Sequence, residues 1–313
     1  MKIRYFDNAA TTAVDSRVLN EMLPYFNIEY GNPSSLYVLG RRNKKAIEDA
    51  RARIAKSLNC SKEEIYFTSC GSESDNLAIK GIMSANNKLG KHVITSKIEH
   101  PAVLNTCKWL EKNGYDVTYL GVDENGRIKL EDIENAIRPD TVLISIMFAN
   151  NEIGTIQPIK EIGEIAKLNN IIFHTDAVQA VGNVKIDVKE LNIDALSLSG
   201  HKLYAPKGIG ALYVKKGIVF DRIQDGGHQE RNKRAGTENV ASIVGLGKAI
   251  ELIYSDFDNY NNKLKNLRDY YISEIEHKID KVKINGDRIN RLPGNANISF
   301  KDVNRRRFTF KVR

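Results

Sequence analysis

The stretch TVLISIMFANNEIGTIQPIKEIGEIAKLNNIIFHTD, residues 141–176, decides the fold class. It opens with an apolar run over 141–148, continues with apolar residues three or four apart over 159–169, and closes with a second apolar run over 171–176. This pattern predicts a strand, an amphipathic helix and a second strand. Because a helical crossover joins parallel neighbours in a sheet, the stretch indicates an α/β unit.

The same alternation continues on both sides of this stretch. Short apolar runs predict further strands at 64–68, 92–96, 116–120, 194–200 and 208–214, and helical spacing predicts helices at 47–58, from about residue 73, at 102–113 and at 130–137. We therefore predict an α/β domain with a mostly parallel central sheet and helices on both faces. A long helical pattern after Ala241 and a strand-like run at 282–284 predict a second, smaller domain from about residue 255.

Length and composition are those of an ordinary globular protein. The chain has 313 residues, of which 42% are hydrophobic and 27% charged, and this mix excludes disordered, collagen-like and coiled-coil classes. No apolar run approaches the roughly 18 residues of a membrane-spanning helix, and the N-terminus lacks the apolar segment of a secretion signal. We therefore expect a cytoplasmic protein that does not bind membranes.

Two features argue against a disulfide framework, a metal site and a nucleic-acid-binding surface. Cys60, Cys70 and Cys107 are three cysteines without a C-x-x-C pair, so we expect no disulfide and no bound metal. The net charge of +8 would favour nucleic acid only if the basic residues were clustered. Their densest internal cluster, 41–45, runs into acidic residues, which is typical of a solvated helix face.

Three candidate functional segments follow strands of the predicted sheet, where α/β sheets bind ligands. The first is FTSCGSES at 67–74, where Gly71 and Ser72 precede a helix whose N–H groups would bind a phosphate. A capping box between Ser72 and Asp75 explains this loop equally well. The loop matches neither a Walker loop nor a dinucleotide fingerprint.

The second candidate is Asp176, at the end of an apolar strand, with Gln179 one turn further on. A carboxylate at a buried strand end needs a charged partner, such as a pyridinium nitrogen; the alternative is a helix N-cap. The third is Lys202, which follows another apolar strand in SGHK at 199–202. Desolvation there would lower the pKa of its amine and favour Schiff-base formation, although a lone lysine after a strand is usually a surface residue.

Together the three segments supply what pyridoxal 5′-phosphate requires, namely a phosphate site, an acid for the ring nitrogen and an amine for the aldehyde. We therefore predict this cofactor. His100 follows the strand at 92–96 and could stack on the pyridine ring, or be an ordinary loop histidine. Asn151 in NNEIG could contact the ring or the substrate, or only form a turn.

Eight segments then resemble, in order and spacing, the NifS/IscS-like cysteine desulfurases of aminotransferase class V. They are YFDNAATT, GNPSSLY, FTSCGSESDNLAIKG, ITSKIEHPAV, NNEIG, HTDAVQ, SGHKLYAPKGIGALY and RAGTENV, and the similarity spans 3–301. The resemblance implies a fold-type I pyridoxal-phosphate transferase that acts as a homodimer. It also implies conversion of L-cysteine to L-alanine, with the sulfur passed as a persulfide to an iron–sulfur scaffold or a tRNA-thiolation partner.

The resemblance implies a role for each candidate residue. Lys202 would bind the cofactor covalently and move the substrate Cα proton, while His100 would stack on the ring and assist. Asp176 would pair with the ring nitrogen. The other implied contacts are Gln179 to the ring hydroxyl, Gly71, Ser72, Ser199 and His201 to the phosphate, Asn151 to cofactor and substrate, and Thr237 to the phosphate of the neighbouring subunit.

The resemblance also implies a large domain over 15–255 and a small α+β domain from 1–14 and 256–313. In the family, the persulfide cysteine and an arginine for the substrate carboxylate follow the strand NISFK, and no residue here matches either. We therefore expect an incomplete small domain and impaired desulfuration. We interpret the divergent basic tail, 304–313, as a frameshift product; the alternative is a genuine tail.

Other functions are open at this point. A selenocysteine lyase or a class V aminotransferase would use the same cofactor. A third alternative is a protein with the same fold that has no catalytic activity. A nucleic-acid-binding module using 41–45 and 305–307 would show an affinity that falls steeply with salt. The resemblance favours cysteine desulfuration without direct contact to nucleic acid.

Overall fold

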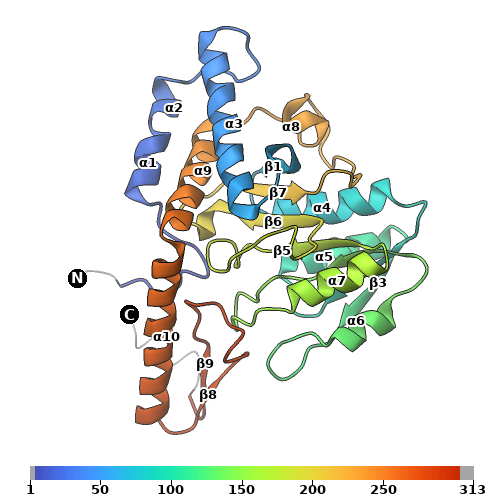
Figure 1. The fold of residues 1–313 in the computed structure, drawn as a ribbon, viewed down its shortest axis with the longest axis vertical. Helices are drawn as coiled ribbons and strands as arrows, with labels where there is room; N and C mark the ends of the chain where they lie inside the picture. The colour runs from blue at the N-terminus through green and yellow to red at the C-terminus, as the bar shows by residue number, and fades with distance from the viewer. Residues whose placement is uncertain (1–3, 304–313) are drawn as a thin grey trace.

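A seven-stranded sheet forms the centre of the molecule, and the computed structural model describes residues 4–303 (Figure 1). Its strands are β1 (Ile65–Thr68), β2 (His92–Ser96), β3 (Asp116–Leu120), β4 (Thr141–Ser145), β5 (Ile172–Asp176), β6 (Ala195–Ser199) and β7 (Gly210–Val214). They lie in the order β1-β7-β6-β5-β4-β2-β3. Neighbours from β6 to β3 pair in parallel, whereas β7 is antiparallel to β1 and β6. The mostly parallel sheet predicted from the sequence is confirmed.

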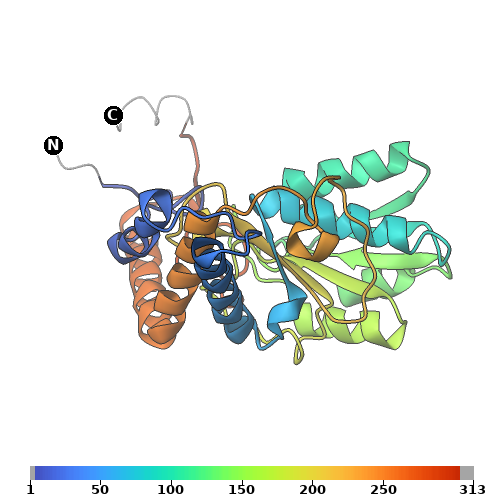
Figure 2. The ribbon, with the colours of Figure 1, turned by 90° about the horizontal axis from the view of Figure 1, so that it is seen from above.

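Helices cover both faces of this sheet, as predicted. They are α4 (Gly71–Ala85), α5 (Pro101–Lys112), α6 (Leu130–Ala136) and α7 (Ile159–Leu168). Figure 2 shows α4 and α5 on one face and α7 on the other. Ile159, Ile162 and Ala166 are buried on one side of α7. Because both faces are covered, central strands such as β6 are buried at every residue, which explains their unbroken apolar runs.

A group of helices packs beside β1 at one end of the sheet. Its members are α1 (Ser16–Met22), α2 (Pro24–Asn27), α3 (Val38–Leu58) and α9 (Val240–Ser255). Gly247 of α9 faces Ala50 of α3, and a Cβ at Gly247 would lie only 2.7 Å from the Ala50 Cβ. The absence of a side chain at Gly247 therefore lets the two long helices approach closely.

Beyond α9 the chain turns at Asp256 into α10 (Phe257–Lys278), which stands beside a two-stranded antiparallel sheet of β8 (Val282–Ile284) and β9 (Ile298–Phe300) (Figure 1). The strand expected at 282–284 is confirmed. The division into a large and a small domain stays a prediction, and the tail 304–313 lies outside the described residues. Within 4–303, no helix has both the length and the apolar character needed to cross a membrane.

Two local expectations need correction. The helix expected from about residue 73 begins at Gly71, with Cys70 at the N-cap and no side-chain cap, so the capping box proposed for Ser72 is wrong. The strand expected over 141–148 ends at Ser145, although the N–H groups of Ile146 and Phe148 still donate to carbonyls of β5. Three short turns complete the described elements, η1 (Lys62–Glu64), η2 (Gly200–Lys202) and α8 (Gln229–Asn232).

Candidate active site

A cavity of about 660 Å³ opens at the carboxyl ends of the parallel strands, the edge at which α/β sheets bind ligands. The loops after β1, β2, β4, β5 and β6 contribute to its lining, as does the N-terminal segment around Ala9. The predicted site residues that the fold brings together here are Gly71, Ser72, His100, Asn151, Asp176, Gln179, Ser199, His201 and Lys202. Thr237 is not among the lining residues; it is exposed in the loop that precedes α9.

Lys202 lies in η2, directly after β6, and its side chain is half-buried under the N-terminal segment. Its Nζ donates to the carbonyl oxygen of Ala10 at 2.7 Å and to that of Ala9. Burial lowers the pKa of Lys202, although the charges of Asp7 and Asp176 oppose the shift. A larger fraction of this amine is therefore neutral, and hence nucleophilic, than for an exposed lysine at the same pH.

Asp176 ends β5 and is only 7% exposed. One carboxylate oxygen accepts the N–H of Val178 at 2.9 Å. Burial raises the pKa of Asp176, and this backbone hydrogen bond and the charges of His100 and Lys202 only partly offset it. A carboxylate in such a place is stabilised by a cationic partner, and a protonated pyridine nitrogen is one.

The start of α4 and the end of β6 form the candidate phosphate site. A Cβ at Gly71 would lie 2.7 Å from Val178 Cγ2, so this turn has room only for glycine. Ser199 Oγ is buried and has no hydrogen-bond partner among residues 4–303. A buried hydroxyl without a partner is costly, and a phosphate oxygen would satisfy it together with the free N–H groups of the helix start.

The remaining predicted residues surround these groups. His100 is exposed at the N-cap of α5, where its Nδ1 accepts the N–H of Ala102 at 3.1 Å. Gln179 Nε2 donates to the Ala9 carbonyl at 3.0 Å, and Asn151 Nδ2 donates to Glu152 Oε1 at 3.1 Å. His201 Nδ1 lies 3.2 Å from the Thr11 hydroxyl, and burial lowers the pKa of His201. The cavity thus fits a phosphorylated pyridine aldehyde: the Lys202 amine suits the aldehyde, the Asp176 carboxylate the ring nitrogen and the Ser199 hydroxyl the phosphate. The other polar side chains surround this space.

Two buried carboxyl groups beside the cavity were not among the site residues predicted from the sequence, where Asp75 was named only as a partner in the capping box. Asp75 of α4 lines the cavity, and its Oδ1 has no hydrogen bond among the described residues, with His174 Nε2 3.7 Å away. Burial, followed by the charge of Asp176, raises the pKa of Asp75 well above normal. Burial raises the pKa of Glu99 to about 8, although Glu99 accepts hydrogen bonds from Ser96 Oγ and Met147 N. The position of Glu99 directly before His100 was the only available signal.

The three cysteines lie in different surroundings. Burial raises the pKa of Cys60 and of Cys107 to about 12, so both stay protonated thiols at neutral pH. Cys70 lines the cavity at the N-cap of α4. Cys60 and Cys107 are therefore poor nucleophiles, in agreement with the expectation that neither carries a persulfide.

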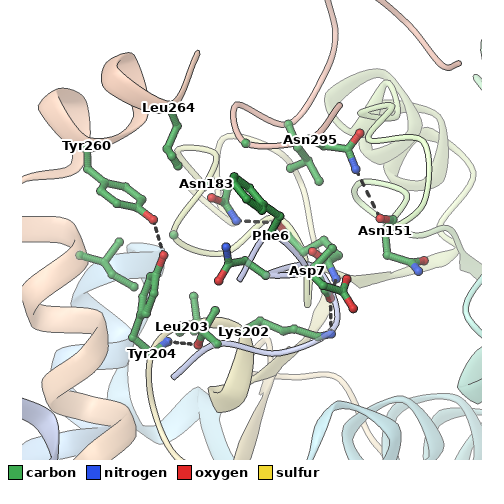
Figure 3. A pocket seen from close by; sticks show the side chains of 18 of the residues that line it. Phe6, Asp7, Asn151, Asn183, Lys202, Leu203, Tyr204, Tyr260, Leu264 and Asn295 are labelled. Carbon is green, nitrogen blue, oxygen red and sulfur yellow. Dashed lines mark hydrogen bonds between the residues drawn. The ribbon is translucent and has the colours of Figure 1, made fainter. Parts of the chain in front are cut away.

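A second cavity of about 320 Å³ adjoins the first and shares Lys202, Asn151 and Gln179 with it (Figure 3). The N-terminal segment, α10 and the loop 292–296 line its other sides. The Tyr260 hydroxyl of α10 lies 2.6 Å from that of Tyr204. Segments from both ends of the described chain therefore frame the space beside the Lys202 amine.

Known proteins are similar to this chain in sequence and in fold. The model of the aminotransferase class-V family matches residues 4–312. The cysteine desulfurase IscS of Clostridium botulinum is 59% identical over 298 residues, which are 95% of this chain and 75% of the relative. The cysteine desulfurase IscS of Methanosarcina thermophila is 58% identical over 302 residues, which are 96% of this chain and 74% of the relative.

Solved structures of other proteins have a similar fold. A NifS-like protein superposes with a TM-score of 0.93 at 39% identity, covering 97% of this chain and 83% of the other. SspA in complex with cysteine superposes with a TM-score of 0.88 at 41% identity, covering 99% and 87%. The family resemblance read from the eight sequence segments is thereby confirmed. This chain belongs to the aminotransferase class-V family and, within it, to the pyridoxal-phosphate-dependent cysteine desulfurases.

Proposed function

We propose that this protein binds pyridoxal phosphate through Lys202 and acts on L-cysteine, releasing L-alanine as the substrate sulfur passes to an acceptor thiolate and forms a persulfide with it. The observation that carries the proposal is the meeting of three groups in one cavity: the Lys202 amine, the buried Asp176 carboxylate and the unpartnered Ser199 hydroxyl. When bound, the cofactor supplies an electron sink that stabilises negative charge at the substrate Cα.

The roles proposed for the protein side chains follow from their surroundings. Lys202 would hold the cofactor aldehyde through Nζ, and its amine would also serve as the base for the substrate Cα proton. Asp176 keeps the ring nitrogen protonated because a cation there stabilises its buried charge. His100 covers the ring face from the N-cap of α5 and assists proton transfer. Asn151 contacts both cofactor and substrate.

The remaining proposed contacts hold the cofactor in place. Gln179 binds the ring hydroxyl. The phosphate binds at Gly71, Ser72, Ser199 and His201 of this chain and at Thr237 of a second copy. The substrate occupies the adjoining cavity between Lys202 and α10, where Asn295 Nδ2 donates to the Asn151 carbonyl. The lowered pKa of Lys202 favours both of its proposed tasks near neutral pH, because each requires the neutral amine.

An absorbance titration with pyridoxal phosphate, followed by L-cysteine, tests this function. We expect the protein to acquire the near-visible absorbance of a cofactor bound through an amine, and cysteine to change that spectrum. Because Cys60 and Cys107 are poor nucleophiles and Cys70 does not match the family position, we expect at most about one alanine per chain. Absence of cofactor absorbance would refute the proposal, and many rapid turnovers would refute the expected impairment.

We also propose that the protein works as a homodimer. From α2 to the N-cap of α3, the large apolar side chains Phe26, Ile28, Tyr30, Leu36 and Tyr37 are exposed, and Leu36 is 88% exposed. Several large apolar side chains exposed within twelve residues favour a protein interface here. A second copy would cover these side chains and would bring the partner's Thr237 to the cofactor phosphate.

Charged residues on this apolar segment are expected to separate the dimer. Phe26→Glu combined with Tyr30→Glu should weaken self-association by roughly 100-fold, because two aromatic side chains would no longer be buried between the copies. Analytical ultracentrifugation over a concentration series measures the change. Leu168→Glu, at an exposed leucine at the end of α7, is the matched control and should leave the dimer intact. A wild-type protein that sediments as a monomer at all concentrations would rule out the dimer.

The same proposal places the reaction in the cytoplasm and assigns the sulfur to an iron–sulfur scaffold or a tRNA-thiolation protein. Transfer of radiolabelled sulfur from cysteine to either purified acceptor distinguishes the two.

A further inference from the structure

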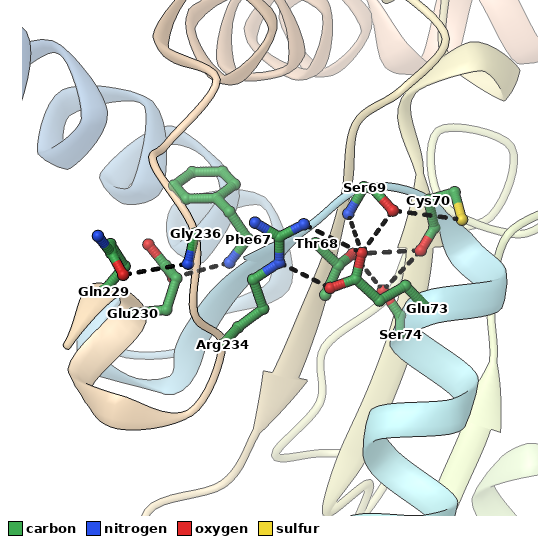
Figure 4. A network of polar contacts seen from close by, with 10 residues as sticks. All are labelled: Phe67, Thr68, Ser69, Cys70, Glu73, Ser74, Gln229, Glu230, Arg234 and Gly236. Atoms are coloured by element: carbon green, nitrogen blue, oxygen red, sulfur yellow. Dashed lines mark hydrogen bonds and ion pairs between the residues drawn. The ribbon is translucent and has the colours of Figure 1, made fainter. Parts of the chain in front are cut away.

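Outside the cofactor cavity, a polar network joins two segments that are far apart in the sequence (Figure 4). One is the turn into α4, residues 69–74, which carries the proposed phosphate site. The other is the segment 228–237, which ends at Thr237. The link between them is an ion pair in which Arg234 Nε donates to Glu73 Oε1 at 2.7 Å and Arg234 Nη2 donates to Glu73 Oε2 at 3.3 Å.

Glu73 also holds the turn itself. It is the third residue of α4, and its Oε2 accepts the backbone N–H of Ser69 at 2.7 Å as well as the Ser69 hydroxyl. Burial alone would raise the pKa of Glu73, but the hydrogen bonds from Arg234 and Ser69 outweigh it and lower the pKa. The carboxylate is therefore charged at neutral pH, and it fixes the backbone directly before Cys70 and Gly71.

The segment 228–237 is fastened at a second point. Glu230, Arg231 and Asn232 all have positive φ values, of 43°, 56° and 65°, which is an unfavourable conformation for side-chain-bearing residues. Buried contacts hold Glu230 in place, since Arg51 donates to both of its oxygens at 2.7 and 2.8 Å and Phe67 N donates at 2.8 Å. The segment is thus tied to β1 by Glu230 and to α4 by Arg234.

We propose that the Glu73–Arg234 ion pair is a positioning device that sets the affinity for the cofactor phosphate and holds the segment 228–237 beside α4, so that its Thr237 is placed to reach the phosphate of a second copy. Neither side chain is proposed to touch the cofactor. The inference rests on the proposed function, because it assumes that the phosphate binds at the start of α4. Glu73 would otherwise place a free negative charge in the first helical turn, close to the dianionic phosphate, and Arg234 neutralises it.

Substitution of either partner should weaken binding of the cofactor phosphate, but for a different reason in each case. In Arg234→Gln, Glu73 keeps its charge but loses its cation, so repulsion of the phosphate increases. In Glu73→Gln, the repulsion disappears, but the carboxylate that holds Ser69 is lost and Arg234 has no anion. The double variant removes both charges, so its loss of affinity should be smaller than the sum of the two single losses.

The test compares binding of pyridoxal phosphate with binding of pyridoxal, which has the same aldehyde and ring but no phosphate. Dissociation constants come from the absorbance change on binding to the full chain. We expect Arg234→Gln to weaken binding of pyridoxal phosphate about tenfold and to leave binding of pyridoxal unchanged. Arg234→Lys, which keeps the positive charge, should recover part of the affinity.

The matched control is Arg222→Gln, because Arg222 belongs to the same loop region and pairs with Asp225 at the surface, with Nε 2.8 Å from Oδ1. This variant should bind both compounds like the wild type. Circular dichroism shows whether each variant folds. If Glu73→Gln does not fold, the comparison of Arg234→Gln with Arg234→Lys still decides the question.

Each outcome separates this inference from the proposed function. A wild-type chain that binds no pyridoxal phosphate refutes both. A wild-type chain that prefers pyridoxal phosphate over pyridoxal, with Arg234→Gln keeping the same preference, refutes the positioning role and leaves the function standing. Equal losses for both compounds in Arg234→Gln would indicate a general structural role and would also overturn the inference.

Discussion

Lys202→Ala is expected to abolish covalent cofactor binding and to lower conversion of cysteine by about 1,000-fold or more, because both proposed steps need its amine. The variant should lack the near-visible absorbance of the wild-type protein mixed with pyridoxal phosphate. The phosphate site is untouched, so the cofactor can still bind without a covalent bond. A dialysed variant should therefore lose the cofactor that the wild type retains.

Lys207→Ala is the matched control for this experiment. Lys207 lies five residues further along the same loop, is exposed, and does not line the cavity. We expect it to retain absorbance and activity. The rate at which the wild-type apoprotein captures the aldehyde should rise with pH, and the rise should occur below the usual range of lysine, because burial lowers the pKa of Lys202. Unchanged absorbance in Lys202→Ala would exclude this residue as the covalent site.

Asp176→Asn is expected to keep the cofactor but to lower cysteine conversion by roughly 100-fold or more, because an amide cannot hold the proton on the ring nitrogen by its charge. The rate of alanine formation in a single turnover, with the protein in excess over cysteine, measures the effect, and the absorbance spectrum reports the bound cofactor separately. Asp194→Asn is the control, since Asp194 lies at the opposite end of β6 and pairs with Lys215 at 2.9 Å. Full activity in Asp176→Asn would refute the role of this carboxylate.

The same variant should have the opposite effect on the stability of the apoprotein. The pKa of Asp176 is raised in the folded state, so folding favours its protonated form. This contribution is favourable below the pKa of the unfolded chain and is lost as pH rises through the raised folded value. At neutral pH, where this carboxyl is ionised in the unfolded chain, its burial therefore opposes folding of the apoprotein, and Asp176→Asn should unfold at an equal or higher urea concentration. A lower unfolding midpoint for the apoprotein variant would contradict this account.

The sequence by itself was sufficient for much of the fold and for most of the predicted residues that line the candidate site. The strands β2, β3 and β5 follow from short apolar runs, and α7 follows from helical spacing, because burial on one face or two leaves a local periodic signal. Asp176 was predicted as a candidate because it ends one such strand, and Lys202 because it closely follows another, β6. In a parallel sheet the carboxyl ends of all strands lie at the same edge. Residues at or just after these ends are therefore expected to lie near one another, even when they are far apart in the sequence.

Tertiary structure alone decided the contacts that join distant segments. The Ala10 carbonyl that holds the Lys202 amine is 192 residues away from it, and Arg234 is 161 residues away from Glu73. No local pattern in the sequence predicts that β7 lies between β1 and β6 and runs antiparallel to both. Such contacts have no period and no fixed spacing, because they depend on how packed elements bring loops together. The sequence therefore determined which groups could do the chemistry, and the packing of the chain determined which groups hold them in place.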